Sequence, residues 1–165
     1  MALLHAGDRF PQIVMRVAGS EDVTVPDVFA GTYGVVLFSR GASCRPCVEQ
    51  LRAFQRSQGR FEKAGISVIV LSTDDEATTE ALRSKYGLAY AVAHSADPSE
   101  IRDRTDAFVT LEPPQLQSTG FVIDPEGDVV VSVYSCGAIG QLLPDDILEL
   151  LRDAQDDRDR AARKP

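Results

Sequence analysis

The chain has 165 residues, of which 44% are hydrophobic and 25% are charged. About 100–200 residues make one domain, and this apolar fraction excludes a disordered chain. Twenty-five acidic against seventeen basic residues give a net charge of −8, which argues against nucleic acid or an anionic membrane as a partner, because both carry phosphates.

The apolar runs give no sign of a membrane or of secretion. None approaches the roughly 18 residues that a transmembrane helix needs. Residues 1–8 lack the basic and long apolar regions of a signal peptide. We therefore expect a cytoplasmic protein, in which three cysteines do not indicate a disulfide scaffold.

In the first half of the chain, the pattern predicts a small hairpin followed by buried strands that alternate with helices. Residues 34–38 form a continuous apolar run with β-branched members, typical of a strand buried on both faces of a parallel sheet. Gly65 and Gly87 are expected to end the two helices. The predicted elements are strands 13–17 and 23–25, a helical turn at 26–31, strand 34–38, a helix from 44 to 64, strand 66–71 and a helix from 73 or 74 to 86.

The second half is predicted to end in an antiparallel hairpin and a helix. The order of elements predicts an α/β fold: a central mixed sheet with helices on both faces and the hairpin at one edge. We expect one domain over residues 1–152, followed by a charged tail, 153–165, that frays into solvent. The predicted elements are strand 91–94, a short helix from Asp97, a loop at 106–117, strands 120–124 and 129–134 around a turn at 125–128, and a helix from Pro144.

The sequence Cys44-Arg45-Pro46-Cys47 lies where a buried strand is followed by a helix. The first turn of a helix has unpaired N–H groups and the positive end of the helix dipole, and both stabilise a thiolate. Arg45, and Arg40 four residues before Cys44, are candidates to add to this effect. The expected chemistry is attack of a thiolate on a disulfide or a peroxide, followed by closure of a Cys44–Cys47 disulfide.

Two other interpretations of the cysteine pair compete with a redox dithiol. A zinc site needs about four ligands, and beyond the pair the chain offers only Cys136, His5 and His94, so we predict no metal. Two buried, inert thiols are the second alternative, because free cysteine is often buried. The chain has no glycine-rich nucleotide motif, and we expect no cofactor.

At this point the sequence resembles a known family. Residues 38–51 (Phe-Ser-Arg-Gly-Ala-Ser-Cys-Arg-Pro-Cys-Val-Glu-Gln-Leu), 68–72, 85–88 and 121–127 look like the motifs of peroxiredoxin-like redoxins, the AhpC/TSA branch of the thioredoxin-fold superfamily. The resemblance extends from about residue 7 to 152, and the C-x-x-C subgroup includes relatives of prostamide/prostaglandin F synthase. It implies a thioredoxin-like fold, a peroxide or disulfide substrate, a thioredoxin-like or small-thiol reductant and, by analogy, a homodimer.

The family pattern also leaves open which cysteine reacts first. If Cys47 takes the place of the peroxidatic cysteine, Cys44 stands where the family has threonine, and Ser118 where it has an arginine. Helix geometry favours Cys44 as the exposed nucleophile and Cys47 as the buried resolving thiol, whereas the peroxiredoxin alignment favours the reverse. Thr119 is a further candidate support, and Cys136 a candidate third thiol.

We therefore predict a thiol–disulfide oxidoreductase that cycles Cys44 and Cys47 and reduces a hydroperoxide or a protein disulfide. Arg40 is a candidate catalytic residue beside the two cysteines, and Arg45, Pro46, Ser118 and Thr119 are candidate supporting residues. The alternative is a redox-sensing or scaffolding domain whose slow thiol pair changes a binding surface.

Overall fold

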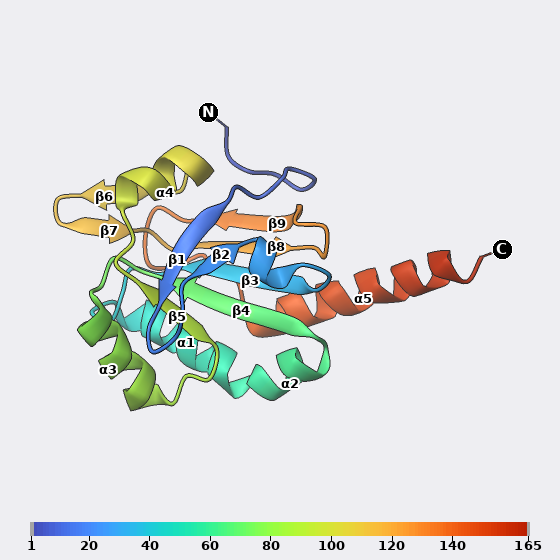
Figure 1. Cartoon of the computed structure of the whole chain (residues 1–165), viewed down its shortest axis with the longest axis horizontal. Coiled ribbons are helices and arrows are strands. Elements are labelled where there is room, and N and C mark those ends of the chain that lie inside the picture. The colour runs from blue at the N-terminus through green and yellow to red at the C-terminus, as the bar shows by residue number, and fades with distance from the viewer. Residues whose placement is uncertain (1, 165) are drawn as a thin grey trace.

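A seven-stranded sheet with the strand order β2-β1-β5-β4-β3-β8-β9 forms the centre of the molecule (Figure 1). The computed structural model describes residues 2–164. The strands of this sheet are β1 (Ile13–Val17), β2 (Val23–Val25), β3 (Tyr33–Phe38), β4 (Ile66–Leu71), β5 (Ala91–His94), β8 (Thr119–Ile123) and β9 (Val129–Tyr134). Within it, β3, β4 and β5 are parallel, and the hairpin β8–β9 adds to β3 antiparallel, which confirms the predicted mixed sheet.

The register of the central strands decides where loops meet. All six residues of β3 are buried, as the continuous apolar run predicted. Phe38 at the end of β3 pairs with Leu71 at the end of β4 and with Thr119 at the start of β8. The loops after β3 and β4 and the segment before β8 therefore converge at one edge of the sheet, where the cysteines lie.

Helices cover both faces of the sheet, as predicted. One core joins β3 and β4 to residues of α1, α2, α3 and α5, and includes the stacked rings of Phe54 and Phe61. The other core packs Ile101 of α4 with Phe10 and Phe121. The helices are η1 (Asp27–Phe29), α1 (Arg45–Arg56), α2 (Gln58–Lys63), α3 (Glu76–Tyr86), α4 (Pro98–Thr105) and α5 (Pro144–Ala162).

Two of the predicted elements need correction. The single helix expected from 44 to 64 is divided into α1 and α2 at Ser57. Two residues later, in the first turn of α2, is Gly59, whose helix propensity is low. The segment 106–117, expected to be a loop, contains a short hairpin of β6 (Val109–Leu111) and β7 (Pro114–Leu116). Strands of three residues, one of them containing a proline, show too little alternation of apolar and polar residues to be predicted from the sequence.

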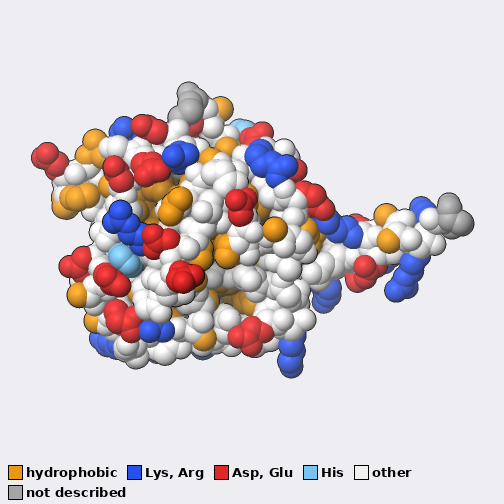
Figure 2. Space-filling view, in the orientation of Figure 1, with side chains coloured by type: hydrophobic (Ala, Val, Ile, Leu, Met, Phe, Trp, Pro, Cys, Tyr) orange, Lys and Arg blue, Asp and Glu red, His pale blue; other side chains and the backbone are white. Residues whose placement is uncertain are grey.

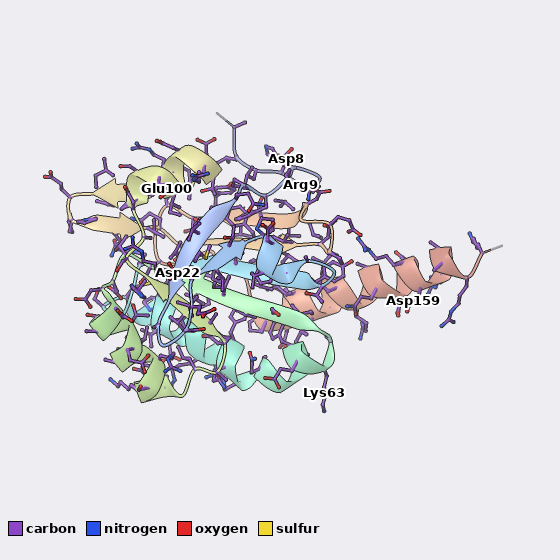
Figure 3. The ribbon with its side chains drawn as sticks, in the orientation of Figure 1. Asp8, Arg9, Asp22, Lys63, Glu100 and Asp159 are labelled. Atoms are coloured by element: carbon purple, nitrogen blue, oxygen red, sulfur yellow. A yellow bond between two sulfur atoms is a disulfide. The ribbon has the colours of Figure 1, made fainter. Side chains whose placement is uncertain are left out.

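The expected frayed tail from residue 153 is also corrected, because α5 continues to Ala162. Arg158 bonds the carboxylate of Glu126 at 2.7 and 3.2 Å, and its guanidinium lies 5.5 Å from the ring centre of Tyr33. These contacts hold the charged part of α5 against the β8–β9 turn. Beyond them the helix projects from the body, with Asp159 on the projecting part (Figures 1 and 3).

The surface carries both signs of charge. On the face in Figure 2, acidic and basic side chains are interspersed over the body, and basic side chains stand out along the projecting end of α5. Within residues 2–164, no helix is both long and apolar enough to cross a membrane.

Candidate active site

Cys44 is the N-cap residue of α1. Its extended backbone (φ −90°, ψ 103°) lets the sulfur accept the N–H of Cys47 at 3.4 Å, while its carbonyl accepts the N–H of Val48 at 3.0 Å. Pro46 lies in the first turn, where a missing N–H leaves no helix hydrogen bond unmade. The sulfur thus occupies the place of a capping oxygen, at the positive end of the helix dipole, which favours a thiolate at Cys44.

A disulfide joins Cys44 and Cys47, whose Cα atoms are 5.3 Å apart. The two residues differ in exposure. Cys47 is fully buried at 0% relative exposure, whereas Cys44 is partly exposed. An incoming thiol can therefore reach Cys44 before Cys47.

The buried sulfur of Cys47 faces two polar side chains from other parts of the chain. Ser118, immediately before β8, places its Oγ 3.7 Å from the sulfur. Gln141, in the loop between β9 and α5, points its Nε2 at the sulfur at 3.9 Å and at Ser118 Oγ at 3.2 Å. Ser118 was a sequence candidate, whereas Gln141 was not, because nothing in the sequence of its irregular loop distinguishes it.

The loop that leads into Cys44 is fixed by a carboxylate. Asp74 accepts the N–H of Ala42 at 2.7 Å, and its side chain lies against Gly41, which has a φ of +100°. The sequence predicted that the following helix starts at residue 73 or 74, whereas α3 starts at Glu76. Only Asp75 caps α3, by accepting the N–H of Thr78 at 2.8 Å, so Asp74 belongs to the active-site loop instead.

Of the two candidate arginines, Arg40 is bonded to a neighbouring side chain and Arg45 is exposed. Arg40 donates from Nε to Gln115 Oε1 at 3.2 Å, and its carbonyl accepts from Gln115 Nε2 at 3.1 Å. Through this reciprocal pair, β7 holds the loop that leads into Cys44. Stabilisation of the thiolates by Arg40 and by Arg45 remains a prediction.

Thr119 and Cys136 lie near the site, and within residues 2–164 neither forms a hydrogen bond to its sulfurs. Thr119 donates its hydroxyl to the carbonyl of Gln117 at 3.2 Å. Cys136 is an exposed free thiol in the loop that starts at Ser135, whose N–H bonds the carbonyl of Ser118 at 3.0 Å. That same loop carries Gln141, so Cys136 shares its scaffold with the site.

Two further observations concern metals and titration. Among residues 2–164 no group of three or more His, Cys, Asp or Glu side chains is placed to hold a metal ion. Tyr90 donates its hydroxyl to the carbonyl of Leu51 in α1 at 2.6 Å. Burial raises the pKa of Tyr90 well above its ordinary value, so Tyr90 supports the cysteine-bearing helix as a neutral phenol.

Comparison with known proteins places these features in a family. Residues 6–132 match the model of the AhpC/TSA family. A peroxiredoxin of Thermotoga petrophila is 27% identical over 155 residues, covering 90% of this chain and 71% of that protein. The chloroplastic peroxiredoxin Q of Gentiana triflora is 32% identical over 132 residues, covering 78% of this chain and 58% of that protein.

Solved structures agree on the fold. Peroxidoxin BcpB from Mycobacterium tuberculosis superposes with a TM-score of 0.78 at 16% identity, covering 91% of this chain and 97% of that one. PrxQ of Xylella fastidiosa gives a TM-score of 0.77 at 15% identity, covering 94% and 99%. At such identities the likeness establishes a thioredoxin-like fold. The narrower resemblance to prostamide/prostaglandin F synthase stays a prediction.

Proposed function

The chain belongs to the AhpC/TSA family, and we propose that it cycles Cys44 and Cys47 between dithiol and disulfide to reduce a hydroperoxide or a protein disulfide. It is a thiol-based oxidoreductase. The observation that carries the proposal is the contrast within the pair: Cys44 is partly exposed at a helix N-terminus, and Cys47 is buried one turn further on.

With a disulfide substrate, Cys44 is the nucleophile. Its thiolate attacks one sulfur of the substrate, and the other sulfur leaves as a thiolate that takes up a proton. The mixed disulfide then lies next to Cys47. The Cys47 thiolate attacks the sulfur of Cys44, which releases the second substrate thiol and closes the Cys44–Cys47 disulfide. Two electrons pass from the dithiol to the substrate.

With a hydroperoxide, a thiolate attacks the terminal oxygen and breaks the O–O bond. The alcohol, or water from hydrogen peroxide, leaves with a proton, and a sulfenic acid remains on the enzyme. The second thiol displaces water from it and forms the same disulfide. Relatives that are named peroxiredoxins support this substrate. If Cys47 is the thiol that attacks the peroxide, Ser118 and Gln141 are the polar side chains beside its sulfur.

The proposal includes partners. A thioredoxin-like protein or a small thiol reduces the disulfide by attacking Cys44, the accessible sulfur. We also propose a cytoplasmic setting, where such reductants are available, and, by family analogy alone, a homodimer. Light scattering tests the dimer by a mass twice 17.9 kDa.

The test is turnover in a coupled thioredoxin and NADPH assay, with hydrogen peroxide or a disulfide-bonded protein as substrate. Cys44→Ser and Cys47→Ser should each abolish turnover, whereas Cys136→Ser, the matched control, should keep it. Full activity in either single variant of the pair rejects the dithiol cycle. Slow, stoichiometric oxidation of the unmodified protein, with no turnover, favours the redox-sensing alternative instead.

A further inference from the structure

We propose that Gln141 and Ser118 form a donor relay that stabilises the buried Cys47 sulfur as a thiolate whenever the disulfide opens. This inference rests on the proposed dithiol cycle and deepens it. It assigns to Gln141 a direct hydrogen bond to a reacting atom.

The need for such donors follows from burial. Cys47 has no solvent exposure, and an anion transferred from water into a protein interior is strongly disfavoured unless hydrogen bonds replace its hydration. The backbone N–H of Cys47 is directed to the sulfur of Cys44. Within residues 2–164, the polar side chains in contact with the Cys47 sulfur are those of Ser118 and Gln141.

The geometry gives the relay a direction. An amide nitrogen has two hydrogens and no acceptor capacity, so Gln141 Nε2 donates both to Ser118 Oγ at 3.2 Å and to the Cys47 sulfur at 3.9 Å. Because Ser118 Oγ accepts from Gln141, its own hydrogen is free to point at the sulfur 3.7 Å away. A hydroxyl that accepts one bond is polarised and donates a stronger one.

The loop that carries Gln141 is anchored for this task. The adjacent carbonyl of Leu142 accepts from Gln50 of α1 at 3.1 Å. The side chain of Leu142 is buried and lies directly over Gly120 of β8, where an added Cβ would meet its Cδ1 at 2.6 Å. Gln141 therefore stands between two fixed elements, the cysteine helix and the strand that follows Ser118.

The relay acts at two steps of the cycle. When a donor thiolate attacks Cys44, the S–S bond breaks and its electron pair goes to Cys47, so stabilising that thiolate makes Cys47 a better leaving group. When a mixed disulfide on Cys44 is resolved, the same donors keep Cys47 deprotonated and ready to attack. Arg40 Nε donates to Gln115 Oε1, and the effect of Arg40 on the thiolates stays a separate prediction.

The experiment titrates Cys47 as a single thiol. Cys44→Ser and Cys136→Ser are combined, since serine at position 44 retains the helix cap, and thiolate absorbance near 240 nm is followed against pH. Adding Gln141→Leu should raise the pKa of Cys47 by about one unit, a tenfold change in the ionisation constant. Gln141→Glu should raise it further, because a carboxylate repels the thiolate.

Gln155→Leu is the matched control. It also removes a side-chain amide, which donates to the carbonyl of Ala64 at 3.3 Å just before β4, at the end of the sheet away from the cysteines, and it should leave the pKa of Cys47 unchanged. In the protein with both cysteines, Gln141→Leu should slow reduction of the disulfide by dithiothreitol several-fold. An unchanged pKa in both Gln141 variants, with circular dichroism matching the parent, overturns the inference. The titration needs no turnover, so it stands or falls apart from the proposed function.

Discussion

Replacing Gly41 by alanine tests how the active-site loop is held. Gly41 has a φ of +100°, where a side chain raises the energy by about 1–3 kcal/mol. In addition, an alanine Cβ would lie 2.7, 2.8 and 2.9 Å from Oδ2, Oδ1 and Cγ of Asp74. These contacts are too short, so the carboxylate must move away from the loop.

That movement breaks the 2.7 Å bond from the N–H of Ala42 to Asp74. A hydrogen bond to a charged group contributes roughly 1.5–3 kcal/mol. Gly31→Ala is the matched control, because Gly31 has a φ of +82° and no atom within 4 Å of the added Cβ. Gly41→Ala should therefore lower the free energy of unfolding by about 1.5–3 kcal/mol more than Gly31→Ala does.

The assay is urea unfolding of the oxidised protein, with the midpoint and slope fitted for each variant. An Asp74→Ala background removes the clash, so adding Gly41→Ala there should lower stability only as much as Gly31→Ala does. Equal losses for Gly41→Ala and Gly31→Ala, or an excess that persists without Asp74, would refute the account of the loop.

Three further predictions concern the scaffold. Tyr90→Phe loses the bond to Leu51 and should be about 1 kcal/mol less stable at pH 7. Burial raises the pKa of Tyr90, so above pH 10 the phenol is neutral in the folded protein and loses its proton on unfolding. The free energy of unfolding should therefore fall less steeply with rising pH in Tyr90→Phe than in the parent. Urea midpoints measured from pH 9 to 12 test this difference. Phe121→Ala empties a site with 0% exposure and should remove about 3–5 kcal/mol in the same assay. Arg158→Ala removes the ion pair with Glu126. It should reduce helical ellipticity at 222 nm and leave the urea midpoint unchanged. An unchanged ellipticity would contradict the anchoring of α5.

The sequence predicted the sheet because its signals are local. The apolar run of β3 and the glycines that end helices report burial and backbone geometry directly, and both appear in the structure. The placement of Cys44 and Cys47 at a strand–helix junction is likewise a local property. It follows from the run before them and the spacing after them, so the cap position of Cys44 could be anticipated.

The partners of the cysteines could not be read from the sequence, since they arrive through tertiary contacts. Gln141 lies 94 residues from Cys47 in an irregular loop, where no periodicity marks one polar residue over another. Asp74 is one of three consecutive acidic residues, and only the fold separates its role from that of Asp75. The charged end of α5 contacts Glu126 through Arg158, and a charged, non-periodic segment does not predict such a contact.

The dithiol cycle is tested most directly by the product of a single oxidation. The fully reduced protein is mixed with one equivalent of hydrogen peroxide, quenched with acid, alkylated, and analysed by intact mass and peptide mapping. The account predicts a protein with one alkylated cysteine, Cys136, and a disulfide between Cys44 and Cys47. A disulfide that contains Cys136, or an oxidised Cys47 beside an alkylated Cys44, would contradict it.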